Sequence, residues 1–186
     1  ISNDTLSGGD DNDQLTGDQG DDLLNGEDGR DTIWGDEGND TVSGGLENDS
    51  IYGGDGEDSL LGNEGNDTVY GEDGLDTLRG GADDDYLSGG EDDDDLQGDS
   101  GNDYLQGDDG NDTLDGGIGD DYLSAGAGTD SLTGDSGSDT LYGGSGTDAL
   151  DGGTDNDSLF GGSGADPVTG GQGAAVLGGG AGPAVL

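Results

Sequence analysis

The sequence lacks several residue types that most folded domains use. It contains no Cys, no His and no Met, and its only basic residues are Arg30 and Arg79. No disulfide can therefore staple a small core, and zinc or copper sites built from thiolates and imidazoles are disfavoured. There is also no apolar run long enough to span a bilayer and no N-terminal signal peptide, which leaves other export routes open.

Positive charge is almost absent. Asp and Glu number 47 against two basic residues, and the net charge is −45. A chain this acidic repels nucleic acid and anionic membranes, because phosphate binding needs Lys and Arg, and it attracts cations. Gly also numbers 47 and only 25% of residues are hydrophobic. Composition alone would therefore predict a disordered chain, unless a regular pattern overrides it.

A period of nine residues runs through the whole chain. Every ninth residue from Leu6 to Leu186 is Leu, Ile or Val, 21 times without insertion or deletion. Asp stands two residues before each of these from Asp4 to Asp166, and Gly stands two residues after, with an exception at Ala125. The unit reads G-(G/D/E/N)-x-G-x-D-x-(L/I/V)-x. Its positions are numbered one to nine below, so that Asp is at position six and the aliphatic residue at position eight.

This period predicts an all-β fold of stacked coils. Nine residues are too few for a helical repeat, and Gly is unfavourable in helices. The triplet around position eight is a minimal strand with its central side chain inward, and the preceding six residues have turn chemistry. Two units make one coil of about 18 residues, and stacked coils form two parallel sheets around the aliphatic row. We therefore expect a parallel β-roll, a β-solenoid, of about ten coils.

The C-terminal repeats depart from the pattern. Position six becomes Ala175 and Ala184, and Pro167 and Pro183 interrupt the unit. We therefore divide the chain into a roll at 1–169 and a degenerate segment at 170–186, which is a cap or the start of a further segment. Because the chain begins and ends in mid-repeat, we expect it to be part of a longer protein.

The position-six carboxylates predict a metal site. The aliphatic row is small beside the conformational entropy of a Gly-rich chain. Asp recurs in every second unit on the same edge of the roll, where like charges repel. A divalent cation between two such carboxylates attracts both of them and holds the two coils together. Oxygen ligands without His or Cys favour calcium, whereas magnesium requires a tighter octahedral shell.

The unit resembles the nonapeptide G-G-x-G-x-D-x-U-x of the repeats-in-toxin (RTX) family, in which U is a large apolar residue. Segments 53–60 and 143–150 match it at each specified position, and segment 62–69 differs only at the second Gly. The resemblance covers essentially the whole chain. It implies a right-handed parallel β-roll with a row of calcium ions along each edge, each ion lying between loops of adjacent coils.

The resemblance also implies the ligands. At one site they are the carbonyls of Asp36 and Gly38 with the side chain of Asp40, and from the next coil the carbonyls of Gly53 and Asp55 with the side chain of Asp58. Pairing each loop with the loop two units later allows at most about 16 ions. The predicted side-chain ligands are Asp13, Asp22, Asp31, Asp40, Asp49, Asp58, Asp67, Asp76, Asp85, Asp94, Asp103, Asp112, Asp121, Asp130, Asp139, Asp148, Asp157 and Asp166. The predicted loop glycines are Gly35, Gly38, Gly53, Gly56, Gly62, Gly65, Gly71, Gly74, Gly98, Gly101, Gly107, Gly110, Gly134, Gly137, Gly143 and Gly146.

Five loops replace the Gly at position four with an acidic residue: Asp11, Glu47, Asp83, Asp92 and Asp155. We expect a positive φ at this position, which Asp tolerates better than most residues. These loops are predicted to form weaker or distorted sites.

The aromatic residues all flank aliphatic positions of one predicted sheet: Trp34, Tyr52, Tyr70, Tyr86, Tyr104, Tyr122, Tyr142 and Phe160. The first three are spaced by two units and are expected to stack as a ladder, as are the next three. Two interpretations stay open. The ladders stabilise the sheet across strands, inherited through a duplication of four units, or the stripe is a contact face for a partner, a glycan or another roll.

No single active site is indicated. Carboxylate pairs that recur identically along the chain mark structure rather than a catalytic centre, so we predict that the chain is not an enzyme. The nine-residue phase excludes an EF-hand, and the absence of Lys excludes a P-loop. The irregular outward positions disfavour an ice-binding Thr array.

The resemblance implies a calcium-responsive module of a larger secreted bacterial RTX protein, such as a toxin, protease, lipase or adhesin. Such proteins leave the cell unfolded by type I secretion and fold outside it, where calcium is abundant, so the expected location is extracellular or at the cell surface. The coupling of metal binding to folding predicts an unfolded ion-free chain. The alternative is a structural rod or self-assembling segment of an adhesin, surface layer or extracellular filament.

Overall fold

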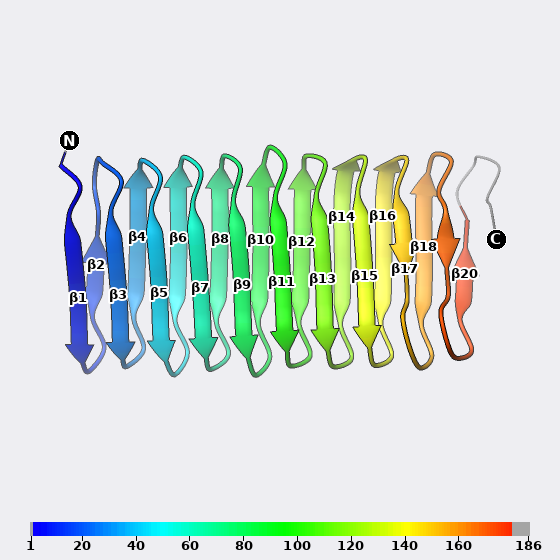
Figure 1. The fold of residues 1–186 in the computed structure, drawn as a ribbon, viewed down its shortest axis with the longest axis horizontal. Helices are drawn as coiled ribbons and strands as arrows, with labels where there is room; N and C mark the ends of the chain where they lie inside the picture. The colour runs from blue at the N-terminus through cyan, green and yellow to red at the C-terminus, as the bar shows by residue number, and fades with distance from the viewer. Residues whose placement is uncertain (1, 180–186) are drawn as a thin grey trace.

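The computed structural model describes residues 2–179, and all of its regular structure is β-strand. Within this range there is no helix of a length and apolar character suited to crossing a membrane. Twenty strands follow one another along the chain and form two parallel sheets of ten strands each. The coils stack into an elongated roll, with β1 and β2 at one end and β19 and β20 at the other (Figure 1).

Odd-numbered and even-numbered strands belong to different sheets. The odd sheet consists of β1 (Thr5–Asp10), β3 (Leu23–Asp28), β5 (Thr41–Leu46), β7 (Ser59–Glu64), β9 (Thr77–Ala82), β11 (Asp95–Ser100), β13 (Thr113–Ile118), β15 (Ser131–Ser136), β17 (Ala149–Asp151) and β19 (Val168–Thr169). The even sheet consists of β2 (Gln14–Thr16), β4 (Thr32–Glu37), β6 (Ser50–Asp55), β8 (Thr68–Asp73), β10 (Tyr86–Glu91), β12 (Tyr104–Asp109), β14 (Tyr122–Gly128), β16 (Thr140–Gly146), β18 (Ser158–Ser163) and β20 (Val176–Gly178).

The register confirms that two units make one coil. Leu87 pairs with Val69 on one side and with Leu105 on the other, so equivalent positions stack in line. The predicted three-residue strand was too short, because most strands have six residues and continue through positions one to three of the next unit. In a parallel stack the N–H and C=O groups of these Gly-rich positions also find partners on adjacent coils, which extends the ladder.

The core is a single row of position-eight side chains between the sheets. From Leu15 to Val168 these residues are at most 5% exposed, and most are completely buried. The row weakens at its ends, where Leu6 is partly buried and Leu177 is 38% exposed. Leu186 lies outside the described residues.

The aromatic residues all lie on the even sheet, and both predicted ladders are present. Within them, neighbouring rings lie 4.7–6.0 Å apart with interplanar angles of 10–12°. The structure also joins the ladders, because Tyr70 contacts Tyr86 at 5.7 Å and Tyr122 contacts Tyr142 at 5.4 Å, both with tilted rings. The tilt arises where the aromatic residue changes from one side of the aliphatic position to the other. All eight rings therefore form one continuous stack, which ends at Phe160.

Removing one core side chain tests the importance of this row. Leu105 is completely buried, so Leu105→Ala leaves a cavity that we expect to cost about 2–5 kcal/mol of unfolding free energy. Thermal unfolding of the folded protein measures the effect, with the exposed Thr113→Ala in the neighbouring strand as the control. Equal melting temperatures for the two variants would contradict the assignment of the core.

Candidate calcium sites between coils

The position-six carboxylates form two buried columns, one along each edge of the roll. Each Asp immediately precedes a strand, so the parallel stacking of strands places Asp22, Asp40 and Asp58 on successive coils. Asp13 is half-buried, and every position-six Asp from Asp22 to Asp166 is at most 4% exposed. Fully buried carboxylates are rare in proteins unless they are paired, so this column needs a specific explanation.

One oxygen of each carboxylate is satisfied by the preceding coil. The backbone N–H of Asp40 donates to Oδ1 of Asp58 at 2.7 Å. The same bond recurs along both columns, for example from Asp94 to Asp112 at 3.0 Å. These bonds orient each side chain along the axis of the roll and leave its second oxygen free to face elsewhere.

The second oxygen, Oδ2, has no hydrogen-bond partner within the part of the chain that the structure describes. This is true of every predicted side-chain ligand from Asp13 to Asp166, and in each of them the atom is buried. A buried oxygen of an ionised carboxylate costs several kcal/mol unless a proton or a cation compensates it. Every unit that carries the motif Asp therefore contains a buried carboxylate oxygen that needs a proton or a cation.

In most repeats the free oxygen and a carbonyl oxygen of the next coil both lie close to the place that a Cβ atom on the position-one Gly would occupy. A Cβ atom added to Gly17 would lie 2.6 Å from Oδ2 of Asp22 and 2.6 Å from the carbonyl oxygen of Gly35. A Cβ atom on Gly143 would meet Asp148 and Gly161 at the same two distances. The position-one Gly thus leaves room for these two oxygens, because a side chain there would overlap both of them.

Further carbonyls point into the same space between the loops of successive coils, which is called a gap below. The carbonyl oxygens of Asp36 and Gly38 point toward the following coil, where a Cβ atom on Gly54 or Gly56 would overlap them. The carbonyl of Asp55 points back and accepts a hydrogen bond from the N–H of Gly38 at 2.9 Å. Carbonyls of positions two and four therefore face forward, and carbonyls of positions one and three face backward.

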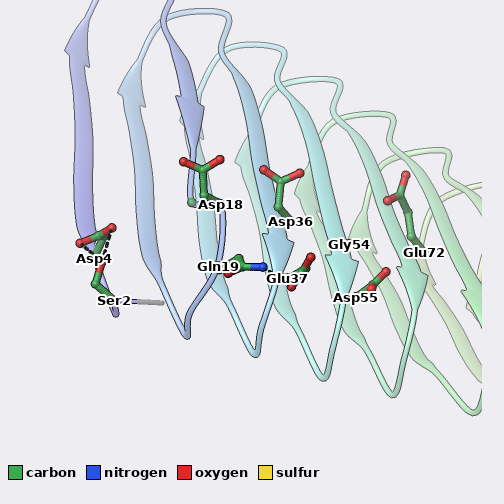
Figure 2. Close-up of a pocket in the computed structure, with 10 residues that line it drawn as sticks. Ser2, Asp4, Asp18, Gln19, Asp36, Glu37, Gly54, Asp55 and Glu72 are labelled. Carbon is green, nitrogen blue, oxygen red and sulfur yellow. Dashed lines mark hydrogen bonds between the residues drawn. The ribbon is translucent and has the colours of Figure 1, made fainter.

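The loop carboxylates at positions two and three point toward solvent rather than into the gaps. Figure 2 shows Asp18, Asp36 and Glu72 in one row, with Gly54 on the coil between Asp36 and Glu72 and with Glu37 and Asp55 beside them, lining a groove at the edge of the even sheet. All five side chains are exposed. At these positions only the backbone carbonyl faces the gap, as expected for Asp36 and Asp55.

The gaps are consequently rich in carbonyl oxygens and poor in charged groups. Among residues 2–179, no three Asp, Glu, His or Cys side chains meet in a cluster of the kind that binds a metal by side chains alone. Each gap is bordered by two carboxylates, from the Asp residues of the two coils that it separates. This donor set of neutral and anionic oxygens suits a hard cation that accepts six or more oxygen ligands.

The predicted loop glycines border the gaps between coils. Those at position one are buried against the free carboxylate oxygen, and those at position four are half-buried. Most position-four residues have a positive φ, as expected, and the five acidic residues there, Asp11, Glu47, Asp83, Asp92 and Asp155, have φ between 73° and 80°. Their carbonyls still face the next coil, because a Cβ atom on Gly101 or Gly110 would overlap the carbonyl of Asp83 or Asp92.

Two loops differ from the others at the gap itself. Ala125 replaces the position-one Gly and is completely buried, so its methyl group occupies the space beside Asp130 that other loops keep open. In the last described coil, Ala175 replaces the carboxylate, and a Cβ atom on Gly170 would meet the methyl group of Ala175 at 2.5 Å. The columns of free oxygens therefore end at Asp166. Pro183 and Ala184 lie outside the described residues.

Sequence reasoning missed a second ladder at position five. There the side-chain oxygen of Asp84 accepts the backbone N–H of Asn102 at 2.7 Å, and Asn102 accepts that of Asp120 at 3.0 Å. These bonds run toward the next coil, opposite in direction to those of position six. The frequent Asn and Asp residues directly before the motif Asp were a signal that could have revealed it.

A comparison with protein-family models finds the RTX calcium-binding nonapeptide repeat, matched in overlapping windows that begin at residue 1 and end at residue 177. The chain belongs to the RTX calcium-binding repeat family. RTX repeats imply calcium binding, and the buried carboxylate oxygens with their surrounding carbonyls fit that ion. A search of curated proteins finds no match to the chain.

Burial shifts the titration of the RTX carboxylates strongly. Loss of hydration raises the pKa of Asp85 to about 8 and those of Asp58 and Asp94 to about 7. The hydrogen bond from the preceding coil lowers each pKa, and neighbouring carboxylates in the column raise it. In the absence of a cation, the folded roll would therefore retain protons near neutral pH.

This shift predicts how the ion-free chain responds to pH. The folded pKa values of about 6–8 lie above the value of about 4 for an unfolded Asp. The folded state then binds more protons, so this contribution to stability is fully present below about pH 4 and is lost as the pH rises through 6–8. We expect ion-free protein in chelator to gain β-structure on acidification from about pH 7.5 to about pH 4.5. Far-UV circular dichroism measures this, and a β signal that grows with rising pH would contradict it.

Proposed function

We propose that this chain is a folding module whose structure depends on calcium ions held between successive coils. The observation that carries the proposal is the recurrence of a buried, unpartnered carboxylate oxygen beside a carbonyl of the next coil. A cation at that place compensates the buried charge and links two coils at the same time. Because the gaps exist only in the stacked state, binding and folding are coupled.

The ligands of one gap follow from the directions of its oxygens. Oδ2 of Asp40 and the carbonyls of Asp36 and Gly38 would act from one coil, and the carbonyls of Gly53 and Asp55 from the next. The carboxylate of Asp58 borders the same gap, where it also accepts the N–H of Asp40. The structure supports this set because the two coils turn these groups toward each other.

The number of ions follows from the columns. Pairing each complete loop with the loop two units later gives up to about 16 ions, which would supply about 32 positive charges against the net charge of −45. Such compensation accounts for a roll that packs carboxylates at the spacing of adjacent parallel strands, about 4.8 Å. The loop of Ala125 and the degenerate segment 170–186 are the places where ions would be missing.

The proposed cellular role follows from membership of the RTX repeat family. We infer that the chain is a non-catalytic part of a larger secreted bacterial protein, exported unfolded by type I secretion and folded by extracellular calcium. Its acidity supports this inference, because self-repulsion keeps the ion-free chain open. No anionic membrane or nucleic acid fits so negative a surface.

A structural rod is the second candidate. Within residues 2–179, β1 and β2 each pair on one side only, so this end of the described roll presents strand edges. Such an edge favours end-to-end stacking of rolls unless another segment covers it. A rod would show regular growth in length with protein concentration in calcium, whereas an isolated folding module would not.

Neighbouring acidic residues in one repeat allow a matched test of the calcium sites. Asp94 is buried and borders two gaps through its bonds to the coils of Asp76 and Asp112, whereas Asp95 is exposed. Asp94→Asn is expected to remove about two bound ions and to raise the calcium concentration needed for folding several-fold. Asp95→Asn makes the same change in charge and should leave both quantities unchanged. Equilibrium dialysis and circular dichroism give the two readouts, and equal behaviour of the variants would refute the assignment.

A further inference from the structure

On one sheet of this very acidic molecule, the outward positions beside the aliphatic row carry no charge. The outward side chains at positions seven and nine of the even strands from β4 to β18 are Thr, Ser, Gln, Tyr, Trp or Phe. The corresponding outward positions of the odd sheet include Arg79, Asp95, Asp115 and Asp151. Uncharged positions thus run along the whole even sheet in a chain with a net charge of −45.

The uncharged surface widens toward the C-terminal half of the roll. Position two lies on the same side of the sheet, because Ser88 Oγ and Gln106 Nε2 donate to the carboxylate of Asp108 at 3.0 and 2.5 Å. This column is acidic at Asp36, Glu72 and Asp108, but from β14 onward it contains only Gly. We define the neutral face as positions seven and nine of β12 together with the outward side of β14, β16, β18 and β20.

The neutral face exposes apolar groups in a flat array. Tyr104 is 37% exposed, Tyr142 is 36% exposed and Val176 is 60% exposed. The rings from Tyr104 to Phe160 lie 4.7–5.4 Å apart in one stack, so neighbouring rings cover one another's faces. What remains accessible is a ridge of ring edges and hydroxyl groups. A sugar ring that stacks on an aromatic face finds few free faces here, whereas a second flat sheet can contact the whole ridge.

We propose that the neutral face packs against the same face of a second copy of this chain. Charge selects this partner and this surface. An anionic partner is repelled by the molecule, and a cationic partner is drawn to the acidic edges rather than to this face. A second copy meets like charges on every acidic surface, and the neutral face is the extended area where two copies approach without confronting carboxylates.

The decrease in negative charge toward the C-terminal half of the even sheet also determines how the two copies are oriented. A two-fold axis near β14 and β16 runs the two rolls antiparallel, so that identical surfaces face each other. With this axis β12 of one copy faces β18 of the other, where position two is Gly162, so the carboxylate of Asp108 confronts no carboxylate of the partner. The sheets pack face to face, at a spacing of about 10 Å.

Calcium controls this contact in two ways. The neutral face exists only when the coils are stacked, and bound ions lower the repulsion between two acidic molecules. The dimer therefore forms in calcium and dissociates in chelator. This goes beyond the proposed folding role, because a module that folds in calcium need not self-associate.

Sedimentation equilibrium in calcium tests the proposal with a matched pair of variants. Tyr104→Glu with Tyr142→Glu places two charges on the neutral face, two coils apart. Thr41→Glu with Thr77→Glu places two charges at exposed sites of the odd sheet, also two coils apart. We expect the wild type and the odd-sheet variant to dimerise and the neutral-face variant to bind itself at least about 10-fold more weakly.

Circular dichroism in calcium establishes that each variant folds. If the Glu variant does not, Tyr104→Thr with Tyr142→Thr replaces it, because Thr already occupies these positions at Thr68 and Thr16 on the same sheet. The proposal is overturned if the wild type stays monomeric up to about 100 µM in calcium, as a surface for a glycan would allow. It is also overturned if the dimer persists in chelator, or if the neutral-face variant dimerises as tightly as the control, as end-to-end stacking would predict.

Discussion

The buried Oδ2 atom of the position-six Asp is the constraint on which the rest of this structure depends. It explains why position one is Gly, since a Cβ atom there would occupy the space between this oxygen and the carbonyl of the next coil. It also explains why carbonyls of two successive loops turn toward one gap. The aliphatic row between the sheets is only one residue wide in each strand, and in the proposed account the gaps at the edges, rather than the core, decide whether coils stack.

Charge organises the molecule at two levels. Within each gap, the proposed cation would offset carboxylates that burial otherwise forces to retain protons. Across the surface, the remaining carboxylates lie on the loops and on both sheets, but in the described strands the outward positions beside the aliphatic row carry carboxylates only on the odd sheet. The proposed folding switch and the proposed contact between copies therefore depend on the same property, the high negative charge of the chain. Bound calcium would reduce this charge, and the neutral face carries little of it.

The features that follow directly from periodicity were predictable. A nine-residue unit with one inward side chain predicts two sheets, a coil of two units and a buried row, and the structure has all three. The positive φ of Asp83 and the placement of all aromatic residues on one sheet were also predicted. Features that depend on contacts between coils were not. Strand length, the joining of the rings at Tyr70 and Tyr86 and the hydrogen bonds of Asn102 arise from the alignment of neighbouring coils, which sequence spacing alone does not specify.

Titration of calcium into metal-free protein at neutral pH, followed by far-UV circular dichroism, tests the central claim most directly. Magnesium serves as the control, because it demands a tighter octahedral shell than carbonyl-rich gaps provide. The account predicts an unfolded ion-free chain and a cooperative gain of β signal with calcium alone. A chain that is already folded in chelator, or that folds equally well in magnesium, would contradict the claim that calcium at the buried carboxylates holds the coils together.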